Sequence, residues 1–214
     1  MHLFRLDASI RTTGSVSRAL ADTAEQAWLA EHPGATVTRR DLGREPLPGD
    51  LWGRAALSMV DPSAPAAPEA AALNERLSAE LLEADAYVFA VPLYNWGVPA
   101  SFKTWIDLVL LNPAFGGAGD RPLAGRPAVL AMSRGGGYGP GAPKEGWDHN
   151  GPYVRRILAE VLHLDVHVTE AELTLADVTP AMAPLRGRAA ELLKTGHEHA
   201  ALHGRRIAEL VVRA

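Results

Sequence analysis

Cysteine is absent from this chain of 214 residues. Its absence excludes disulfides, thiolate nucleophiles and cysteine-ligated zinc or iron–sulfur centres. The chain also lacks any apolar run close to the roughly 18–20 residues that a membrane-spanning helix needs. The first residues, Met1 to Arg5, form a short apolar stretch without the three-part pattern of a secretory signal. These absences predict a cytoplasmic protein with no membrane partner.

A strong excess of one charge is missing as well. The chain has 21 basic and 25 acidic residues, a formal net charge of −4, which gives no general attraction for nucleic acid. The basic pairs Arg39-Arg40 and Arg205-Arg206 are explained by solvated ends of elements. The hydrophobic fraction of 47% can fill a core and argues against global disorder. We therefore expect a single domain over residues 1–214 and no nucleic-acid partner.

Strand-like apolar runs alternate with helix-like stretches along the chain. This order builds a parallel sheet with helices on both faces. The predicted strands are Leu3–Ala8, Ala35–Leu42, Ala86–Pro92, Pro127–Met132 and Asp165–Leu173. The predicted helices are Ser15–Glu31, a short one near Trp52–Met59 in a long loop, Glu69–Ala84, Pro99–Leu111, Gly151–Leu164 and Pro180–Val212. The fold class is α/β, a doubly wound five-stranded parallel sheet in the order 2-1-3-4-5.

Ligands of open parallel sheets bind beyond the carboxyl ends of the strands. That rule selects the segments after the first, third and fourth strands, which are neighbours in this order. The three segments are Ala8–Ser17, Pro92–Pro99 and Ser133–Tyr138. We expect them to face one crevice.

The first segment is rich in hydroxyl side chains and leads into a helix. The unpaired N–H groups and positive dipole of a helix N-terminus stabilise a phosphate, and hydroxyls can donate further hydrogen bonds. The segment is neither a Walker A loop nor a G-x-G-x-x-G turn. A simpler alternative is that Ser15 or Ser17 only caps the helix. Capping explains one serine but not the whole cluster.

The other two segments suit a flat heterocycle. Tyr94 and Trp96 offer aromatic walls, and the Asn95 amide carries both donors and an acceptor for a polar ring edge. The alternative is that both aromatic rings merely pack on the following helix. Consecutive glycines from Gly135 to Gly137 let the backbone approach a ligand closely.

These motifs resemble those of the FMN-dependent NADH:azoreductase and NAD(P)H quinone reductase family. The resemblance rests on Ser9, Ser15-Val16-Ser17, Pro92 to Trp96, Ser133 to Gly136, Lys103 with Asp107, and Pro152-Tyr153. It covers most of the chain and is carried by motifs rather than by continuous similarity. The resemblance implies a flavodoxin-like fold and a homodimer with one FMN near the interface of each subunit.

The resemblance also implies roles for individual residues. Ser9, Ser15, Val16 and Ser17 would hold the FMN phosphate, and Leu93, Tyr94, Asn95, Trp96, Ser133, Arg134, Gly135 and Gly136 would hold the isoalloxazine ring. NADH or NADPH would reduce the flavin, which then reduces a quinone or azo-type acceptor in ping-pong order. Because the flavin carries the chemistry, no catalytic side chain is required.

Several positions depart from the family pattern. Val16 stands where a polar residue is common, and Trp96 replaces a smaller phenylalanine. The stretch that shapes the family's acceptor pocket keeps only the aromatic Phe115. Phe115 and Tyr138 are the expected pocket residues, and the Trp147–Asn150 loop is a further candidate for its border.

Other chemistries have less support in the sequence. His197, His199 and His203 lack the H-E-x-x-H pattern and a third ligand, so a solvated helix face is expected and no metal. Asp107 is expected to be structural, and Ser133 is not in a hydrolase G-x-S-x-G elbow. Two alternatives remain open: a flavin reductase that supplies reduced FMN to a partner oxygenase, and a non-catalytic flavodoxin-like electron carrier.

Overall fold

A five-stranded parallel sheet forms the centre of the molecule. The computed structural model describes residues 1–61, 63–116 and 121–213. The strands are β1 (His2–Asp7), β2 (Thr36–Asp41), β3 (Ala86–Pro92), β4 (Pro127–Ser133) and β5 (Asp165–Ala171). They pair in the order β2-β1-β3-β4-β5, and every pair is parallel. The predicted fold class and strand order are confirmed.

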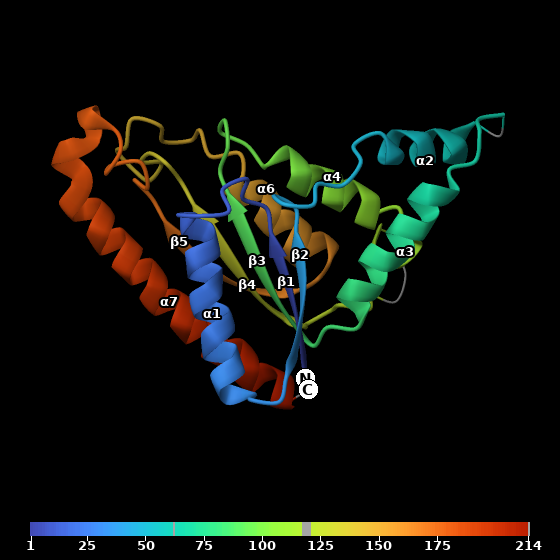
Figure 1. The fold of residues 1–214 in the computed structure, drawn as a ribbon, viewed down its shortest axis with the longest axis horizontal. Helices are drawn as coiled ribbons and strands as arrows, with labels where there is room; N and C mark the ends of the chain where they lie inside the picture. Colours follow the sequence, from blue (N-terminus) through green and yellow to red (C-terminus); the bar gives the residue numbers. More distant parts are fainter. Residues whose placement is uncertain (62, 117–120, 214) are drawn as a thin grey trace.

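Helices cover both faces of this sheet. They are α1 (Val16–Glu31), α2 (Leu51–Val60), α3 (Pro68–Leu82), α4 (Ala100–Val109), α5 (Pro113–Gly116), α6 (Gly151–Arg156) and α7 (Arg186–Arg213). A π-helical turn, η1 (Ile157–Val161), continues α6, and a 3₁₀ segment, η2 (Pro180–Leu185), precedes α7. In Figure 1, α1 and α7 lie along one face, α3, α4 and α6 along the other, and α2 projects beyond α3 and α4.

Alternating side chains of the buried strands build a separate core on each face. In β1, Leu3 joins the cluster beneath α1 and α7, and the next residue, Phe4, joins the cluster beneath α3, α4 and α6. The central strands β3 and β4 are buried along their whole length. This burial explains why their sequences are continuously apolar, because a central strand has no face in water.

Three local predictions differ from the structure. Pro99 precedes α4 as its cap residue rather than opening the helix. The helix predicted over 151–164 passes into the π-helical turn at Ile157. The stretch 112–125, for which no helix or strand was predicted, contains α5; its residues 117–120 lie outside the described residues. Asn112 caps α5 by accepting from the N–H of Ala114 at 3.0 Å.

The parallel register brings the ends of β1, β3 and β4 to one edge of the sheet. Asp7 lies beside Ala90, and Pro92 lies beside Ser133. The segments that follow these strands therefore start close together. None of the helices in the described part of the chain is long and apolar enough to cross a membrane.

Candidate functional site

The three predicted segments meet through hydrogen bonds at this edge. The hydroxyl of Tyr94, after β3, lies 3.1 Å from Oγ of Ser9, after β1, and accepts from the N–H of Ile10 at 3.2 Å. The N–H of Leu93 donates to the carbonyl oxygen of Ser133 at 2.9 Å, which links the β3 and β4 segments. The predicted convergence of the three segments is confirmed.

The serine turn after β1 combines a helix cap with two buried hydroxyls. Ser15 is the N-cap of α1, and its Oγ accepts from the N–H of Arg18 at 3.5 Å. Capping therefore accounts for Ser15. Ser9 and Ser17 are buried without serving as this cap, and Oγ of Ser17 lies 3.4 Å from that of Ser15. Gly14, with φ of +64°, makes the left-handed bend that turns the chain into the helix.

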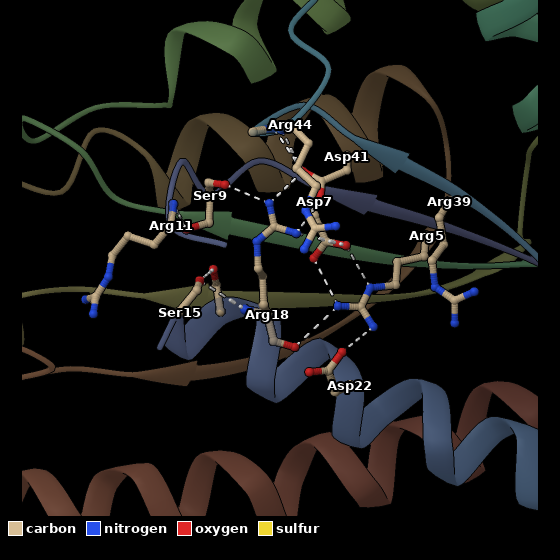
Figure 2. Close-up of polar contacts among 12 residues, drawn as sticks. Arg5, Asp7, Ser9, Arg11, Ser15, Arg18, Asp22, Arg39, Asp41 and Arg44 are labelled. Carbon is tan, nitrogen blue, oxygen red and sulfur yellow. Dashed lines mark hydrogen bonds and ion pairs between the residues drawn. The ribbon is translucent and has the colours of Figure 1, made fainter. Parts of the chain in front are cut away.

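A buried network of charges lies behind this turn. Figure 2 shows Arg18 of α1 reaching from the serine turn to the end of β2. Its guanidinium donates to the carbonyl oxygen of Ser9 at 2.7 Å and to both carboxylate oxygens of Asp41 at 2.6 and 2.7 Å. The lack of a side chain at Gly43 leaves room for this contact, because a Cβ there would lie 2.1 Å from the Ser9 carbonyl oxygen. Arg18 thus fixes the backbone of Ser9.

Arg5 extends the network beneath α1 and pairs with three carboxylates. It bonds Asp7 at 3.0 Å, Asp22 at 2.6 Å and Glu25 at 3.0 Å. Burial alone would lower the pKa of Arg5, but hydrogen bonds with these carboxylates outweigh it and raise the pKa. The hydrogen bond to Asp41 raises the pKa of Arg18. Burial opposes the charge on Asp41, yet its bonds to Arg18 hold its pKa below the ordinary value. Arg5, Arg18 and Asp41 are therefore ionised at neutral pH.

The turn after β3 holds its residues in a strained conformation. Tyr94 and Gly97 exchange two backbone hydrogen bonds of 3.1 and 2.9 Å, so Asn95 and Trp96 form a two-residue turn. Both have positive φ, 47° for Asn95 and 64° for Trp96. Asparagine tolerates this region, but a bulky side chain rarely adopts it. Strain of this kind persists only where surrounding bonds hold it, and it concentrates at functional sites.

The glycine turn after β4 presents backbone to the edge, while Arg134 faces away. The Arg134 guanidinium bonds Asp148 at 2.7 Å and lies 3.1 Å from Glu170. Burial would lower the pKa of Arg134, but Glu170 and Asp148 raise it above its ordinary value. The Arg134 side chain, which was expected at the flavin ring, is thus paired with acidic side chains instead. Gly135 is required locally, since a Cβ there would meet Leu175 at 2.7 Å.

A cleft of about 500 Å³ opens between these turns. The predicted residues in its walls are Leu93, Tyr94, Asn95, Trp96, Gly135, Gly136 and Tyr138. Ile10, Lys144 and Leu175 also line it and were missed. Ile10 lay in the selected first segment, and its exposed apolar side chain was the available signal. Lys144 and Leu175 reach the cleft through loop folding that has no local sequence signal.

Phe115 lies apart from this cleft. It is buried in the core beneath α3, α4 and α6 and does not line the cleft, contrary to the expected pocket role. The short α5 turns this ring inward, where burial stabilises it. Asp107 bonds Nζ of Lys103 at 2.6 Å, within α4. Among the described residues, no group of three or more possible ligands is arranged to hold a metal ion.

The residues around the cleft fit an FMN group. The serine turn supplies hydroxyl donors beside the first-turn N–H groups of α1, which have no acceptor within the helix. This donor set suits a phosphate without any lysine. The cleft supplies aromatic walls, glycine backbone and the Asn95 amide, a set that suits a planar ring with polar edges.

Comparison with known proteins assigns the chain to a class. A family model described as a flavodoxin-like fold matches residues 1–194, so the chain belongs to that family. Within it, curated relatives of this chain share a name. An "FMN-dependent NADH:quinone oxidoreductase" of Kineococcus radiotolerans is 43% identical over 194 residues, covering 88% of this chain and 91% of the relative. One of Streptomyces avermitilis with the same name is 34% identical and covers 97% of both chains. This chain is a member of that group.

Solved structures support the fold independently. An azoreductase from Bacillus anthracis (strain Sterne) has a TM-score of 0.72 at 23% identity, covering 96% of this chain and 99% of that one. An FMN-dependent NADH-azoreductase from Bacillus anthracis (Ames Ancestor), solved in complex with FMN, has a TM-score of 0.73 at 14% identity. It covers 97% of this chain and 99% of its own. At these identities the likeness shows the shared fold.

Proposed function

We propose that this protein is an FMN-dependent oxidoreductase that transfers hydride from NADH or NADPH, through FMN, to a quinone or azo-type acceptor. The observation that carries the proposal is the cleft at which three strand ends meet. Its walls offer aromatic rings and glycine backbone for a flat ring, and the neighbouring serine turn offers phosphate donors. The shared name of relatives that match nearly the whole chain supports the same reaction.

The chain's own residues would bind and orient the cofactor. Ser9, Ser15, Ser17 and the backbone of Val16 would hold the phosphate, because hydroxyls and first-turn N–H groups gather there. Leu93 to Trp96, Ser133, Gly135 and Gly136 would hold the ring, with Asn95 at its polar edge. Arg134 would act indirectly, by anchoring the glycine turn to Asp148 and Glu170. When bound, FMN supplies the hydride-accepting and hydride-donating ring.

Tyr138 would shape the acceptor side of the cleft. It lines the cleft from the loop after β4, opposite Trp96. Burial raises the pKa of the Tyr138 hydroxyl, so it stays neutral and can donate a hydrogen bond at physiological pH. Because the donor and the acceptor would use one cleft in turn, the kinetics would be ping-pong.

The test is purification followed by flavin analysis and steady-state kinetics. We expect co-purifying FMN and oxidation of NADH or NADPH that depends on an added quinone or azo compound. A protein that neither binds FMN nor oxidises either nucleotide with any quinone would refute the proposal. FMN retention without reaction with a nucleotide would favour an electron carrier. Nucleotide oxidation that requires free FMN and releases it reduced would favour a flavin reductase.

We also propose that the chain forms one functional domain, works as a homodimer and resides in the cytoplasm. Exposed apolar side chains gather on α2, including Leu57, Met59 and Val60. A projecting helix with these exposed apolar side chains suits a contact with a second copy. Equilibrium sedimentation tests the homodimer, and fractionation of cells tests the location.

A further inference from the structure

Lys144 occupies the mouth of the cleft between two aromatic rings. Its Nζ lies 5.8 Å from the ring centroid of Trp96 and 5.8 Å from that of Tyr138. Trp96 follows β3, Tyr138 follows β4, and Lys144 belongs to the loop before α6. These distances are within the range of cation–π attraction, which holds the ammonium between the two walls.

The loop that carries Lys144 is fastened to the turn after β3. The N–H of His149 donates to the carbonyl oxygen of Trp96 at 2.9 Å. The Trp147 ring also meets the Trp96 ring edge-on, with centroids 5.7 Å apart. Lys144 is thus placed at the cleft by contacts on the same loop, rather than left as a free surface side chain.

Lys144 differs from the other two lysines of the chain in its ion pairing. Lys103 and Lys194 each pair with a carboxylate four residues later, Asp107 and Glu198. In the described part of the chain, Lys144 makes no ion pair within 4.0 Å; its recorded contacts are the two rings.

The carboxylates of the surrounding loops are already engaged. Asp148 accepts from Arg134 at 2.7 Å, and Glu172 accepts from the N–H of Tyr138 at 3.2 Å. Glu145 accepts from the N–H of Gly141 at 2.7 Å. The positive charge at the mouth is therefore available to a ligand.

Lys144 also stands where two clefts adjoin. A second cleft of about 550 Å³ lies between the glycine turn, η2 and α7. Gly136 and Lys144 line both clefts. The second is walled mainly by apolar side chains such as Leu173, Met182 and Leu192. A ligand larger than one ring system can therefore extend from the first cleft into the second cleft, with the Lys144 ammonium beside it.

We propose that Lys144 binds an oxyanion carried by an aromatic substrate whose flat ring lies at the mouth of the first cleft, outside the position proposed for the FMN ring. This inference rests on the proposed function and specifies the substrate class of the same site. The oxyanion has two possible sources: a carboxylate or sulfonate on the acceptor, and the diphosphate of the nicotinamide nucleotide. Both offer the same chemistry to an ammonium, a charge-assisted hydrogen bond.

Ping-pong kinetics separate the two sources, because each substrate has its own kcat/KM. The acceptors are naphthoquinone and naphthoquinone sulfonate, which differ by one negative charge. In K144Q we expect the ratio of kcat/KM for the charged acceptor to that for the neutral acceptor to fall about tenfold, the size of one charged hydrogen bond. A tenfold fall in kcat/KM for the nucleotide, with the acceptor ratio unmoved, supports the inference with the donor as the source.

Two further variants serve as controls. K144R keeps the charge and should recover most of the lost ratio. K194Q removes a lysine that is paired with Glu198 on α7, away from both clefts, and should leave the ratio as in the wild type. An acceptor ratio and a nucleotide kcat/KM that both stay within twofold in K144Q would overturn the inference.

Equilibrium binding gives a readout that does not depend on turnover. Naphthalene sulfonate and naphthol, which are not reduced, are titrated into FMN-saturated protein by calorimetry. Where the acceptor is the source, the sulfonate should bind more tightly than naphthol, and K144Q should remove that preference. Equal binding of both ligands to wild type, together with an unchanged nucleotide kcat/KM in K144Q, overturns the inference. Selective sulfonate binding by a protein that reduces no quinone would instead refute the proposed function and leave the inference standing.

Discussion

At the scale of single residues, the site depends on contacts between segments far apart in sequence. Tyr94 reaches Ser9 and Ile10 across 85 and 84 positions. Arg18 holds the carbonyl of the same Ser9 from behind. The serine turn is thus fastened on both sides, which lowers the entropy that a phosphate ligand would otherwise have to remove.

Tyr94→Phe tests the first of these contacts. The ring would remain as a wall of the cleft, while the hydroxyl that contacts Ser9 and Ile10 would be lost. Losing this hydroxyl should weaken FMN binding about fivefold to tenfold, since a net hydrogen bond contributes about 1 kcal/mol. Fluorescence titration of the apoprotein with FMN measures this affinity. Tyr153→Phe, which alters a ring on α6 outside the cleft, is the control. Equal affinities of both variants would contradict this role.

Arg18→Gln tests the second contact. The change leaves Asp41 without its main partner in a partly buried setting. Breaking such a pair typically costs about 3 kcal/mol. Urea denaturation should show a loss of this order in the free energy of unfolding. Arg206→Gln removes one member of an exposed pair with Glu209 and should cost less than about 1 kcal/mol. Similar losses in the two variants would show that the network does not stabilise the fold.

At the scale of elements, α1 and α7 approach each other through small residues. A Cβ added to Gly204 of α7 would lie 2.3 Å from the carbonyl oxygen of Ala24 and 2.9 Å from Cβ of Ala27. The two helices can therefore touch with their backbones. This close contact allows the long α7 to cover the sheet beside α1 and bury the core cluster beneath both (Figure 1).

Gly204→Ala should force these helices apart. Overpacking of this kind costs about 1–3 kcal/mol, which outweighs the gain in helix propensity from alanine. Gly187→Ala is the matched control, since nothing lies within 4 Å of its added Cβ. Thermal unfolding should show a lower Tm for Gly204→Ala and a Tm at or slightly above that of the wild type for Gly187→Ala, which gains helix propensity without a clash. A Tm for Gly204→Ala at or above the wild type would disprove the close contact.

The contact between β5 and α7 should make stability depend on pH. Burial lowers the pKa of His203, and the neighbouring His167, whose ring centroid is 5.4 Å away, lowers it further. The unfolded chain then binds a proton near pH 6.5 while folded His203 stays neutral. The contribution of neutral His203 to stability is complete above pH 6.5. It is lost as the pH falls through the lower pKa of His203 in the folded state. His203→Gln should flatten the fall of the urea midpoint between about pH 7 and about pH 5. An exposed control, His149→Gln, should keep the slope.

At the scale of the whole molecule, α2 projects beyond its neighbours and leaves most of its residues exposed. Leu57, Met59 and Val60 are between 52% and 79% exposed. Exposed apolar side chains that gather on one projecting element mark a candidate interaction surface.

The homodimer proposal predicts that Leu57→Asp with Val60→Asp, two positions on one face of α2, shifts the protein toward monomer. Two charges on this face would have to be desolvated in a dimer interface, which is costly. Light scattering after gel filtration measures the mass over a dilution series. Leu202→Asp with Val212→Asp places the same charges on exposed positions of α7 and should leave the mass unchanged. A wild type that is monomeric at all concentrations would refute the dimer.

Much of this organisation was determined by the sequence alone. The bounds of β3 were predicted to the residue, the parallel sheet followed from the alternation of strands and helices, and the meeting of three loops followed from the predicted strand order. These features are local or follow from general rules, since an apolar run of strand length has few alternatives. The cluster of serines also marks the first turn in the sequence itself.

Only the tertiary structure decided the partners of individual side chains. It turned Arg134 toward Asp148, buried Phe115 in the core, brought Arg18 to Ser9 and placed Lys144 between Trp96 and Tyr138. Each outcome depends on which loops pack together and on which buried charge finds a counter-charge. Such contacts join distant positions, and nothing in the periodicity of a single segment encodes them.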